Sequence, residues 1–296
     1  MKGISDHDSH AELREGLRAL CNQFDGAYWQ KVDEARGYPE AFVDALTKAG
    51  WLSALIPEEY GGSGLTLTAA SVIMEEINRS GGNSGACHGQ MYNMGTLLRH
   101  GSEEQKRRYL PKIASGELRL QSMAVTEPTA GTDTTKIKTV AARKGDRYVV
   151  NGQKVWTSRI QHSELMILLA RTTPLTDVKK KSEGMSIFIV DLREAAKKGM
   201  AIRPIRNMVN HETNELFFDN LEIPAENLIG EEGKGFKYIL DGLNAERILI
   251  AAECIGDGYW FFDSASHYER ERVVFDRTIG KKQGMLFPIA SYYVNV

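Results

Sequence analysis

The chain has 296 residues, of which 42% are hydrophobic and 26% are charged. This composition is typical of a globular protein with enough apolar side chains for a core, and it excludes a disordered chain. The formal net charge of -2 comes from 37 basic and 39 acidic residues, so we expect no nucleic-acid partner and no membrane partner.

The cysteines and the first residues indicate the compartment. Cys21, Cys87 and Cys254 lie far apart and form no C-x-x-C pair, and their odd number argues against a disulfide framework. The first residues are polar and acidic, unlike a secretory signal or a transit peptide. No apolar run approaches membrane-spanning length. We therefore predict a soluble, cytoplasmic protein, or one of the mitochondrial matrix if the source is eukaryotic.

The first helices are predicted from their ends. Ser9 and Glu12 form a capping-box pattern before the segment 13–24, which has apolar residues at helical spacing. Pro39 and Gly50 bracket a second helix, in the order typical of helix starts and ends.

Three further helices are expected before residue 119. Segments 67–80 and 84–100 are predicted as buried helices. Ser102 and Gln105 form a capping box for the next helix, which Pro111 is expected to kink or split.

From residue 119 the hydrophobic period changes to that of strands. Short segments rich in β-branched and aromatic residues alternate with turn residues, which predicts a small antiparallel barrel or sandwich. Asn151 and Gly152 predict a hairpin turn between YVV and KVW. The predicted strands lie in segments 120–127, 136–144, 147–158, 164–172, 185–191 and 215–223.

The segment 235–276 predicts one long apolar helix, which we expect to be central to a bundle. The order of helices, strands and helices predicts an α+β fold with several domains. We expect an N-terminal helical domain over 1–118, a middle antiparallel β domain over 119–230, and the start of a C-terminal helical bundle over 231–296. One long helix and a short remainder do not make a bundle, so the last domain is expected to be incomplete.

The stretch MAVTEPTAGTD, residues 123–133, joins a strand to a polar loop. Gly131 lets the backbone approach a ligand closely, and the loop combines N–H groups with several threonine hydroxyls. Such donors suit a phosphate or the polar edge of a ring, whereas an ordinary β-turn is the alternative. Trp156 is either a core side chain or a flat surface on which a planar cofactor packs.

Glu246 lies in the long helix, three and four positions from Gly242, Leu243, Leu249 and Ile250. Burial among them should raise its pKa, which suits a general base near neutral pH. The alternative is a structural glutamate satisfied by an arginine from another helix. The seven histidines are scattered, so no metal site is predicted.

Two ordered signatures, MAVTEPTAGTD and NGQKVWTS, closely resemble the flavin signature of the acyl-CoA dehydrogenase family. The resemblance extends through IPEEYGGSGL, GSEEQKRRYLPKIASGEL, FFDNLEIPAENLIGEEGKGFKYIL and ERVVFDRTIGKKQG, and so covers nearly the whole chain. It implies an FAD enzyme that desaturates an acyl-CoA thioester between the carbons α and β to the carbonyl, as part of fatty acid metabolism.

The resemblance also implies roles for particular residues. The loop would hold the flavin edge and pyrophosphate, with Thr132 also facing the acyl-CoA entrance. The segment around Trp156 would pack on the other face of the ring, with Ser158 near its reactive nitrogen. The flavin-binding residues implied by the two segments are Met123, Val125, Thr126, Gly131, Thr132, Trp156, Thr157 and Ser158.

Glu246, just before a helix arginine, resembles the catalytic base of isovaleryl-type and long-chain-type members. Asn244 and Arg247 match positions that line the CoA side of the pocket. Arg272 and Gln283 match residues that reach the flavin of a neighbouring subunit. After that arginine the family usually has Phe-Gly, whereas this chain has Phe275 and Asp276.

Family members pass their electrons to an electron-transfer flavoprotein and form dimers or tetramers, so both partners are expected here. Family members also continue with helices that complete the bundle and the tetramer, which leaves two alternatives. The first is a truncated, non-catalytic remnant that binds FAD weakly or not at all. The second is a relative with different chemistry, such as an acyl-CoA oxidase.

Overall fold

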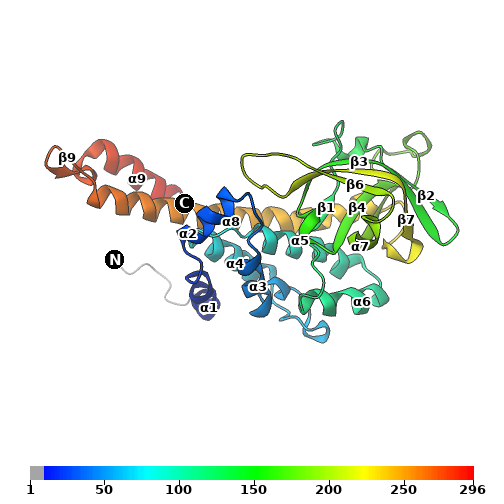
Figure 1. The fold of residues 1–296 in the computed structure, drawn as a ribbon, viewed down its shortest axis with the longest axis horizontal. Helices are drawn as coiled ribbons and strands as arrows, with labels where there is room; N and C mark the ends of the chain where they lie inside the picture. Colours follow the sequence, from blue (N-terminus) through cyan, green and yellow to red (C-terminus); the bar gives the residue numbers. More distant parts are fainter. Residues whose placement is uncertain (1–9) are drawn as a thin grey trace. The chain divides into compact units, whose positions relative to one another are not determined.

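The computed structural model describes residues 10–296, which divide into two compact units. The first unit contains the residues up to 29 together with 67–84 and 247–296, and the second contains 30–66 and 85–246. Figure 1 labels the helices and strands. The helical, sheet and helical regions are arranged in the predicted order, and the fold class is confirmed. The boundaries of the three predicted domains stay a prediction.

The first unit is helical. Its α1 packs on α4, where the carboxylate of Glu76 accepts hydrogen bonds from Arg14 at 2.5 Å and Arg18 at 2.6 Å. The predicted cap Ser9 lies outside the described residues, and α1 begins after His10 without a side-chain cap. The helices that contribute to this unit are α1 (Ala11–Cys21), α4 (Leu67–Arg79), most of α8 (Gly235–Glu271) and α9 (Gln283–Asn295).

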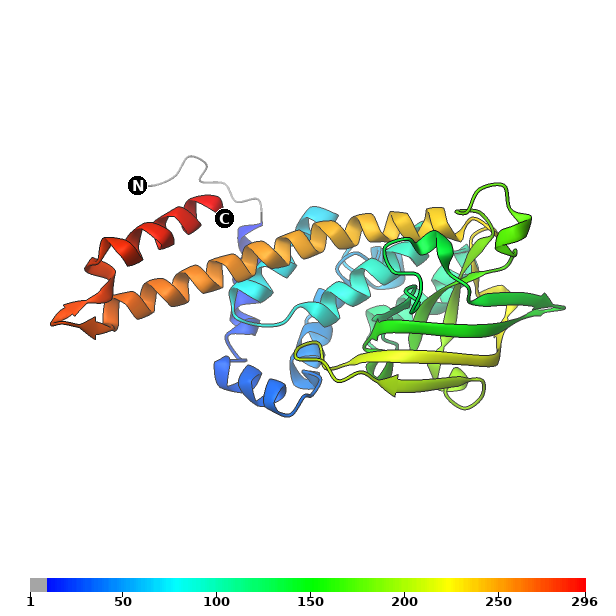
Figure 2. The same ribbon diagram turned by 90° about the horizontal axis from the view of Figure 1, so that it is seen from above.

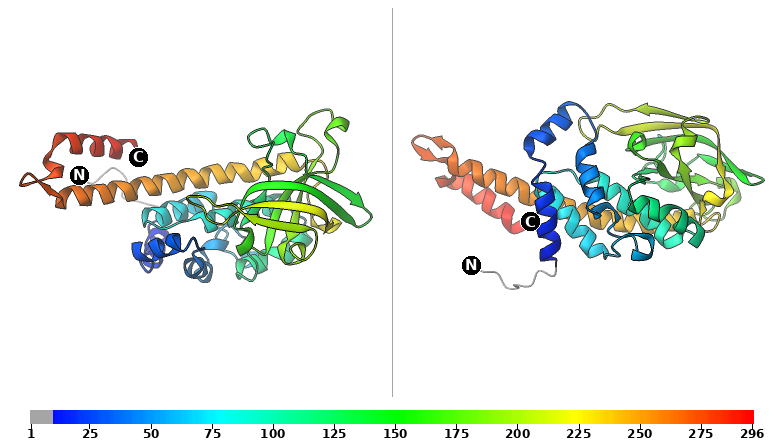
Figure 3. Two further views of the ribbon diagram at one scale, coloured as in Figure 1. Left: turned by 45° about the horizontal axis from the view of Figure 1, so that its top comes forward. Right: turned by 60° about the horizontal axis from the view of Figure 1, so that its bottom comes forward.

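Helix α9 returns along the end of α8 (Figure 3), and the rings of Phe262 and Tyr293 lie 4.6 Å apart. The two helices are joined by strands β9 (Val273–Val274) and β10 (Arg277–Thr278). Phe275 and Asp276 make the turn between them with φ of 55° and 56°, the geometry of a two-residue hairpin loop. Both helices carry exposed apolar side chains; Phe261 is 58% exposed and Phe287 is 60% exposed. None of the helices within residues 10–296 combines the length and apolar character needed to cross a membrane.

The second unit combines helices with a sheet. Ser102 and Gln105 form the predicted capping box, because each side chain bonds the other residue's backbone N–H at 3.1 Å. Pro111 does not split the helix, which continues to Ala114. Helix α2 (Gly26–Glu34), which the sequence patterns missed, begins in the first unit and ends in the second. The other helices are α3 (Glu40–Lys48), α5 (Gly85–His100), α6 (Glu103–Ala114) and α7 (Leu192–Ala195).

The sheet has eight strands, paired in the order β6-β7-β3-β2-β4-β5-β8 with β1 beside β4. Most pairs are antiparallel, as predicted, but β1 and β2 each pair with β4 in parallel. The long strands β3 and β7 lie side by side (Figure 2). The strands are β1 (Ser122–Ala124), β2 (Val140–Lys144), β3 (Arg147–Ser158), β4 (Leu165–Arg171), β5 (Met185–Asp191), β6 (Met200–Pro204), β7 (Thr213–Pro224) and β8 (Leu228–Ile229).

The predicted hairpin at Asn151 and Gly152 is wrong, because both residues lie inside the single strand β3. The register against β7 shifts between Val150 and Gly152, which marks a β-bulge. Gly152 has φ of 151°, and a Cβ there would lie 2.5 Å from the hydroxyl of Thr139. Glycine is therefore required by a bulge and a close contact rather than by a turn. The chain turns instead at Gly145, between β2 and β3.

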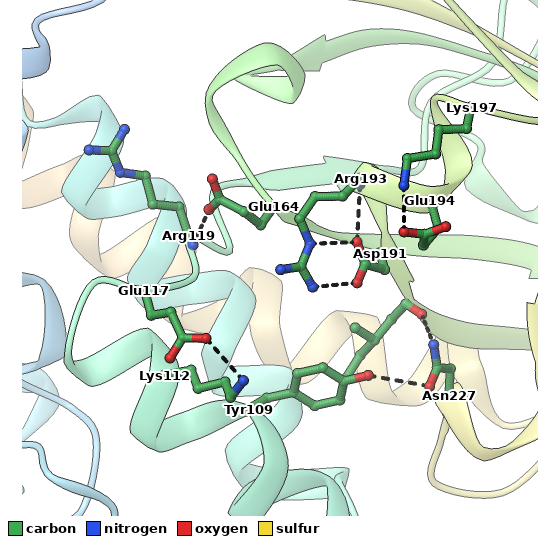
Figure 4. Close-up of polar contacts among 11 residues, drawn as sticks. Tyr109, Lys112, Glu117, Arg119, Glu164, Asp191, Arg193, Glu194, Lys197 and Asn227 are labelled. Atoms are coloured by element: carbon green, nitrogen blue, oxygen red, sulfur yellow. Dashed lines mark hydrogen bonds and ion pairs between the residues drawn. The ribbon is translucent and has the colours of Figure 1, made fainter.

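Hydrogen bonds join α6 to the sheet (Figure 4). The Tyr109 hydroxyl donates to Asn227 at 3.3 Å, and the Asn227 amide donates to the carbonyl of Ile189 at 3.0 Å. After α6, the Arg119 N–H donates to the Glu164 carboxylate at 2.6 Å. The side chains beneath the sheet form a core that includes Tyr148, Phe188 and Leu168. Helix α5 packs against β1, and β1 lies against β3. The candidate site is built on the ends of these two strands.

Candidate functional site

A cavity of about 320 Å³ in the second unit brings together six of the predicted site residues. Its walls come from the end of β1, the loop that follows it, the end of β3, helix α5 and the first part of α8. The lining residues are Tyr92, Met123, Val125, Thr126, Thr134, Val155, Trp156, Ser158, Leu243 and Glu246.

Trp156 reaches this cavity because of a second bulge in β3. The register against β7 shifts between Lys154 and Thr157, and Trp156 has φ of 63°, which is uncommon for a bulky residue. Its side chain is 59% exposed. A bulge can re-aim a side chain next to a site, so the indole is a flat apolar surface open to a ligand rather than a core side chain.

The loop after β1 is held tightly at one side of the cavity. Glu127 and Ala130 exchange two backbone hydrogen bonds of 3.0 and 3.1 Å. The Val155 N–H donates to the carbonyl of Thr126 at 3.0 Å, which ties the loop to β3. A Cβ built on Gly131 would meet no atom within 4 Å, so the space beside it is open.

Ser158 is also fixed by neighbours. The Asn210 amide donates to the Ser158 hydroxyl oxygen at 3.1 Å, and the Ser122 hydroxyl donates to the Ser158 carbonyl at 2.8 Å. The Ser158 hydroxyl keeps its own hydrogen for a further acceptor. Beside it, Thr157 is 1% exposed, and its hydroxyl has no hydrogen-bond partner among residues 10–296.

Glu246 lines the cavity from α8 and is partly buried. Of the apolar neighbours on which the prediction of a raised pKa was based, Gly242 and Leu249 are buried, but Ile250 is 40% exposed. The predicted pKa shift stays a prediction. The position nevertheless places one carboxylate in the same cavity as an indole and four side chains with hydroxyl groups.

A second cavity, of about 570 Å³, is lined in part by Thr129 of the same loop. Its walls contain Thr129 and the basic residues Lys136, Lys138, Arg171 and Lys181, with no acidic side chain among the residues that line it. Arg171 is 3% exposed and donates to four backbone carbonyls at 2.6 to 3.1 Å, so it clamps the surrounding loops. Lys136 pairs with Asp133 at 3.1 Å, so the positive charge of the cavity comes from its other basic residues. That charge suits an anionic group.

A third cavity, of about 340 Å³, lies beside α6 in the region drawn in Figure 4. Several of its charged side chains have partners of opposite sign; Arg108 pairs with Glu226 at 2.6 Å, and Asp191 pairs with Arg193 at 2.6 Å. None of the predicted site residues lines it. No group of His, Cys, Asp and Glu side chains within residues 10–296 could hold a metal ion.

The sequence matches three domain families along nearly its whole length. Residues 7–117 match the N-terminal domain of acyl-CoA dehydrogenases, residues 122–221 the middle domain, and residues 233–296 the C-terminal domain. The chain belongs to the acyl-CoA dehydrogenase family.

Members of the acyl-CoA dehydrogenase family with known names or structures resemble this chain closely. Rice mitochondrial isovaleryl-CoA dehydrogenase is 36% identical over 294 residues, covering 98% of this chain and 70% of the relative. Cyclohex-1-ene-1-carbonyl-CoA dehydrogenase of Syntrophus aciditrophicus is 33% identical over 273 residues, covering 90% of this chain. The match spans 64% of the length of that relative. The crystal structure of acyl-CoA dehydrogenase from Geobacillus kaustophilus has a TM-score of 0.89 at 29% identity, covering 99% of this chain and 77% of that one.

Other residues predicted for the site do not line the cavity. Gly131 and Thr132 are exposed in the loop, and Asn244 is exposed on α8. Thr157, described above, is buried and does not line the cavity. Arg247, Arg272 and Gln283 belong to the other compact unit and are exposed there.

The sequence patterns missed four residues that line the cavity. Tyr92 belongs to the segment 84–100, which is predicted only as a buried helix, yet it lines the cavity from α5. Thr134, Val155 and Leu243 complete the walls. The patterns also missed Lys154, although it lies within the NGQKVWTS signature. A lysine at an inward position of a strand was the signal that could have identified it, because lysine is almost never fully buried unless it is paired.

Proposed function

We propose that this chain is an FAD-dependent acyl-CoA dehydrogenase that introduces a double bond between the α and β carbons of an acyl-CoA thioester. Family membership and one geometric observation support this: a carboxylate, a polar loop and an exposed indole line a single cavity. Bound FAD would supply the hydride acceptor.

The residues of the cavity fit the edge and face of a planar cofactor. Thr126 and Ser158 offer hydroxyl groups, and the exposed indole of Trp156 offers a flat apolar surface. The bulge at Trp156 and the hydrogen bonds to Ser158 hold these groups before a ligand arrives, which is how preorganised sites gain affinity.

Glu246 is proposed as the base that removes the α proton, because it is the one carboxylate among the residues that line the cavity. Its partly buried position on α8 limits its contact with water. A base must lie within hydrogen-bond reach of the proton that it removes, so the acyl chain would have to enter between Glu246 and the loop.

The cationic cavity supports a CoA thioester as substrate. CoA carries phosphate groups, and two of the four basic residues of this cavity, Lys136 and Lys138, come from the segment after β1 that also lines the first cavity. We propose that an electron-transfer flavoprotein accepts the electrons and that the chain acts as a homo-oligomer, since both are expected of the family.

The visible spectrum of the purified protein tests this proposal. Protein reconstituted with FAD should be yellow and should bleach when a series of acyl-CoA thioesters is added without oxygen. Glu246→Gln should keep the colour and abolish bleaching, whereas Glu222→Gln, at an exposed residue of β7, should bleach normally. Protein that takes up no FAD would favour the non-catalytic alternative. Rapid recolouring in air with release of peroxide would indicate an oxidase.

A further inference from the structure

Lys154 is fully buried in β3, with no exposed side-chain surface. It lies between the two shifts in register of β3 against β7, next to the residues that line the first cavity. Moving an ammonium group out of water is very unfavourable unless partners compensate for it. An apolar side chain would fill an inward strand position at lower cost, so the lysine calls for an explanation.

The partners of Lys154 come from the loop after β1. Its Nζ donates to the carbonyl oxygen of Val125 at 2.8 Å and to Oε1 of Glu127 at 2.9 Å. Burial lowers the pKa of Lys154 to about 8, and the charge of Glu127 opposes this shift. The lysine is therefore mainly charged at neutral pH.

Glu127 is held as firmly as the lysine. It is 5% exposed, and its carboxylate accepts hydrogen bonds from the backbone N–H groups of Lys138 at 2.6 Å and Thr139 at 2.9 Å. Burial alone would raise the pKa of Glu127, but the charge of Lys154 and these backbone donors outweigh it and lower the pKa. The carboxylate stays ionised, so the pair is a buried ion pair in which hydrogen bonds hold both members.

The ion pair determines how the peptide between Val125 and Thr126 is oriented. In a trans peptide the C=O and the following N–H point in opposite directions. Because the Val125 carbonyl points to the buried ammonium group, the Thr126 N–H points away from it, on the side where Val125 and Thr126 line the cavity. Within residues 10–296 this N–H has no hydrogen-bond acceptor. The positive charge of the Lys154 ammonium group, beside the Val125 carbonyl oxygen, also polarises the peptide and strengthens the Thr126 N–H as a donor.

We propose that Lys154 is a positioning residue; this inference rests on the proposed function. Through the Val125 carbonyl it aims a polarised Thr126 N–H at the polar edge of the flavin ring. Glu127 neutralises the lysine so that this arrangement can exist inside the protein. The pair thereby links the two signatures of the sequence, since Glu127 belongs to the first and Lys154 to the second.

Titration of apoprotein with FAD, followed by flavin absorbance and fluorescence, tests this role. The variant is the double substitution Lys154→Met with Glu127→Gln, which removes both charges of the ion pair together, so that neither member is left without the other. We expect it to fold, with an unchanged circular dichroism spectrum, but to bind FAD at least 10-fold more weakly and with a shifted flavin absorption band. Lys144→Met, which removes an exposed lysine of β2 in the same sheet, is the matched control and should bind FAD as the wild type does.

The possible results separate this role from the proposed function. Wild-type protein that takes up no FAD contradicts both. Wild-type protein that binds FAD, with a double variant of equal affinity and equal spectrum, overturns the positioning role alone. The spectral shift is the informative signal, because a merely structural role would weaken binding without changing the band.

A second measurement, made on wild-type protein without the cofactor, tests the role of Lys154 if the double variant does not fold. In wild-type apoprotein, the ¹³C chemical shift of the Val125 carbonyl should titrate with a midpoint near the pKa of Lys154, about 8. The charged groups that act on this titration are Glu127 and, through Glu127, Arg171. Over the pH range in which the ¹⁵Nζ shift of Lys154 titrates, a Val125 carbonyl shift that stays constant would show that the hydrogen bond is absent in solution and would overturn the role.

Discussion

Two buried carboxylates, Glu127 in the second unit and Glu76 in the first, are held in different ways. Glu76 is 1% exposed and pairs with Arg14 and Arg18, whose side chains are 19% and 51% exposed. Glu127 is 5% exposed and pairs with a lysine that has no exposed surface. The partners of Glu76 can turn toward water if the pair is broken, whereas Lys154 cannot. The pair beside the cavity should therefore be the more sensitive of the two.

The largest effect is expected from breaking the pair at the cavity. Glu127→Gln should lower the free energy of unfolding by about 3–5 kcal/mol, because it leaves a buried ammonium group without a counter-charge. Urea denaturation followed by tryptophan fluorescence measures this. Adding Lys154→Met should recover much of the loss. A loss below about 1 kcal/mol, the range of an exposed ion pair, would contradict the burial of the lysine.

Glu76→Gln should have a smaller effect, about 1–3 kcal/mol, because a buried hydrogen-bonded network is weakened but its cations can still reach water. The same denaturation experiment applies. Glu222→Gln, which alters a half-exposed residue 3.9 Å from Arg147, is the control and should change the free energy of unfolding by less than about 0.5 kcal/mol. If Glu76→Gln were as damaging as Glu127→Gln, solvent access of the partners would not explain the difference.

The two pairs should also differ in how stability depends on pH. The folded pKa of Lys154, about 8, lies below its value of about 10.4 in an unfolded chain. Between these values the unfolded chain binds more protons, so the free energy of unfolding should rise with pH, by at most about 1.4 kcal/mol per pH unit. Urea denaturation of the wild type from pH 7 to 10, compared with the Lys154→Met, Glu127→Gln double variant, isolates this contribution. Parallel curves for the two proteins would contradict it.

Glu76 should instead affect the free energy of unfolding at acid pH. Burial alone would raise its pKa, but hydrogen bonds from Arg18 and Arg14 lower it below the ordinary value. Its contribution is therefore present above the unfolded pKa of about 4.3 and is lost as the pH falls through the folded pKa. Stability curves of wild type and Glu76→Gln should converge as the pH falls through the folded pKa of Glu76.

The smallest effect is expected from removing one exposed partner. Arg18→Ala should lower the free energy of unfolding by about 0.5–1 kcal/mol, because Arg14 still pairs with Glu76 at 2.5 Å. A shift of the urea midpoint with an unchanged slope would measure it. A loss as large as that of Glu76→Gln would mean that Arg18 carries the interaction alone.

Helices with strong end signals were predictable from sequence, because capping is local. The box of Ser102 and Gln105 is present, and the long helix runs over Gly235–Glu271. The Asn-Gly pair at 151 failed as a turn signal because long-range pairing of β3 with β7 overrode the local preference. The same pairing creates the bulge that exposes Trp156, which no periodicity could indicate.

Part of the candidate site was also predictable. Met123, Val125, Thr126, Trp156, Ser158 and Glu246 were named from two signatures and a helix position, and they line one cavity. Tyr92 and Leu243 were not named as site residues, because their place in the wall depends on how α5 and α8 lie against the sheet ends. The ion pair of Glu127 and Lys154 was missed because its members are 27 residues apart and look like ordinary charged residues of a loop and a strand.

The sequence by itself determined the family, the order of helices and strands, and the residue types available for chemistry, because these follow from local patterns and ordered signatures. Only the tertiary structure decided which of those residues meet. Strand register, two bulges and a buried ion pair act over long separations in the chain. Their free energies arise from burial and from pairing between distant segments, so they appear only when those segments are packed together.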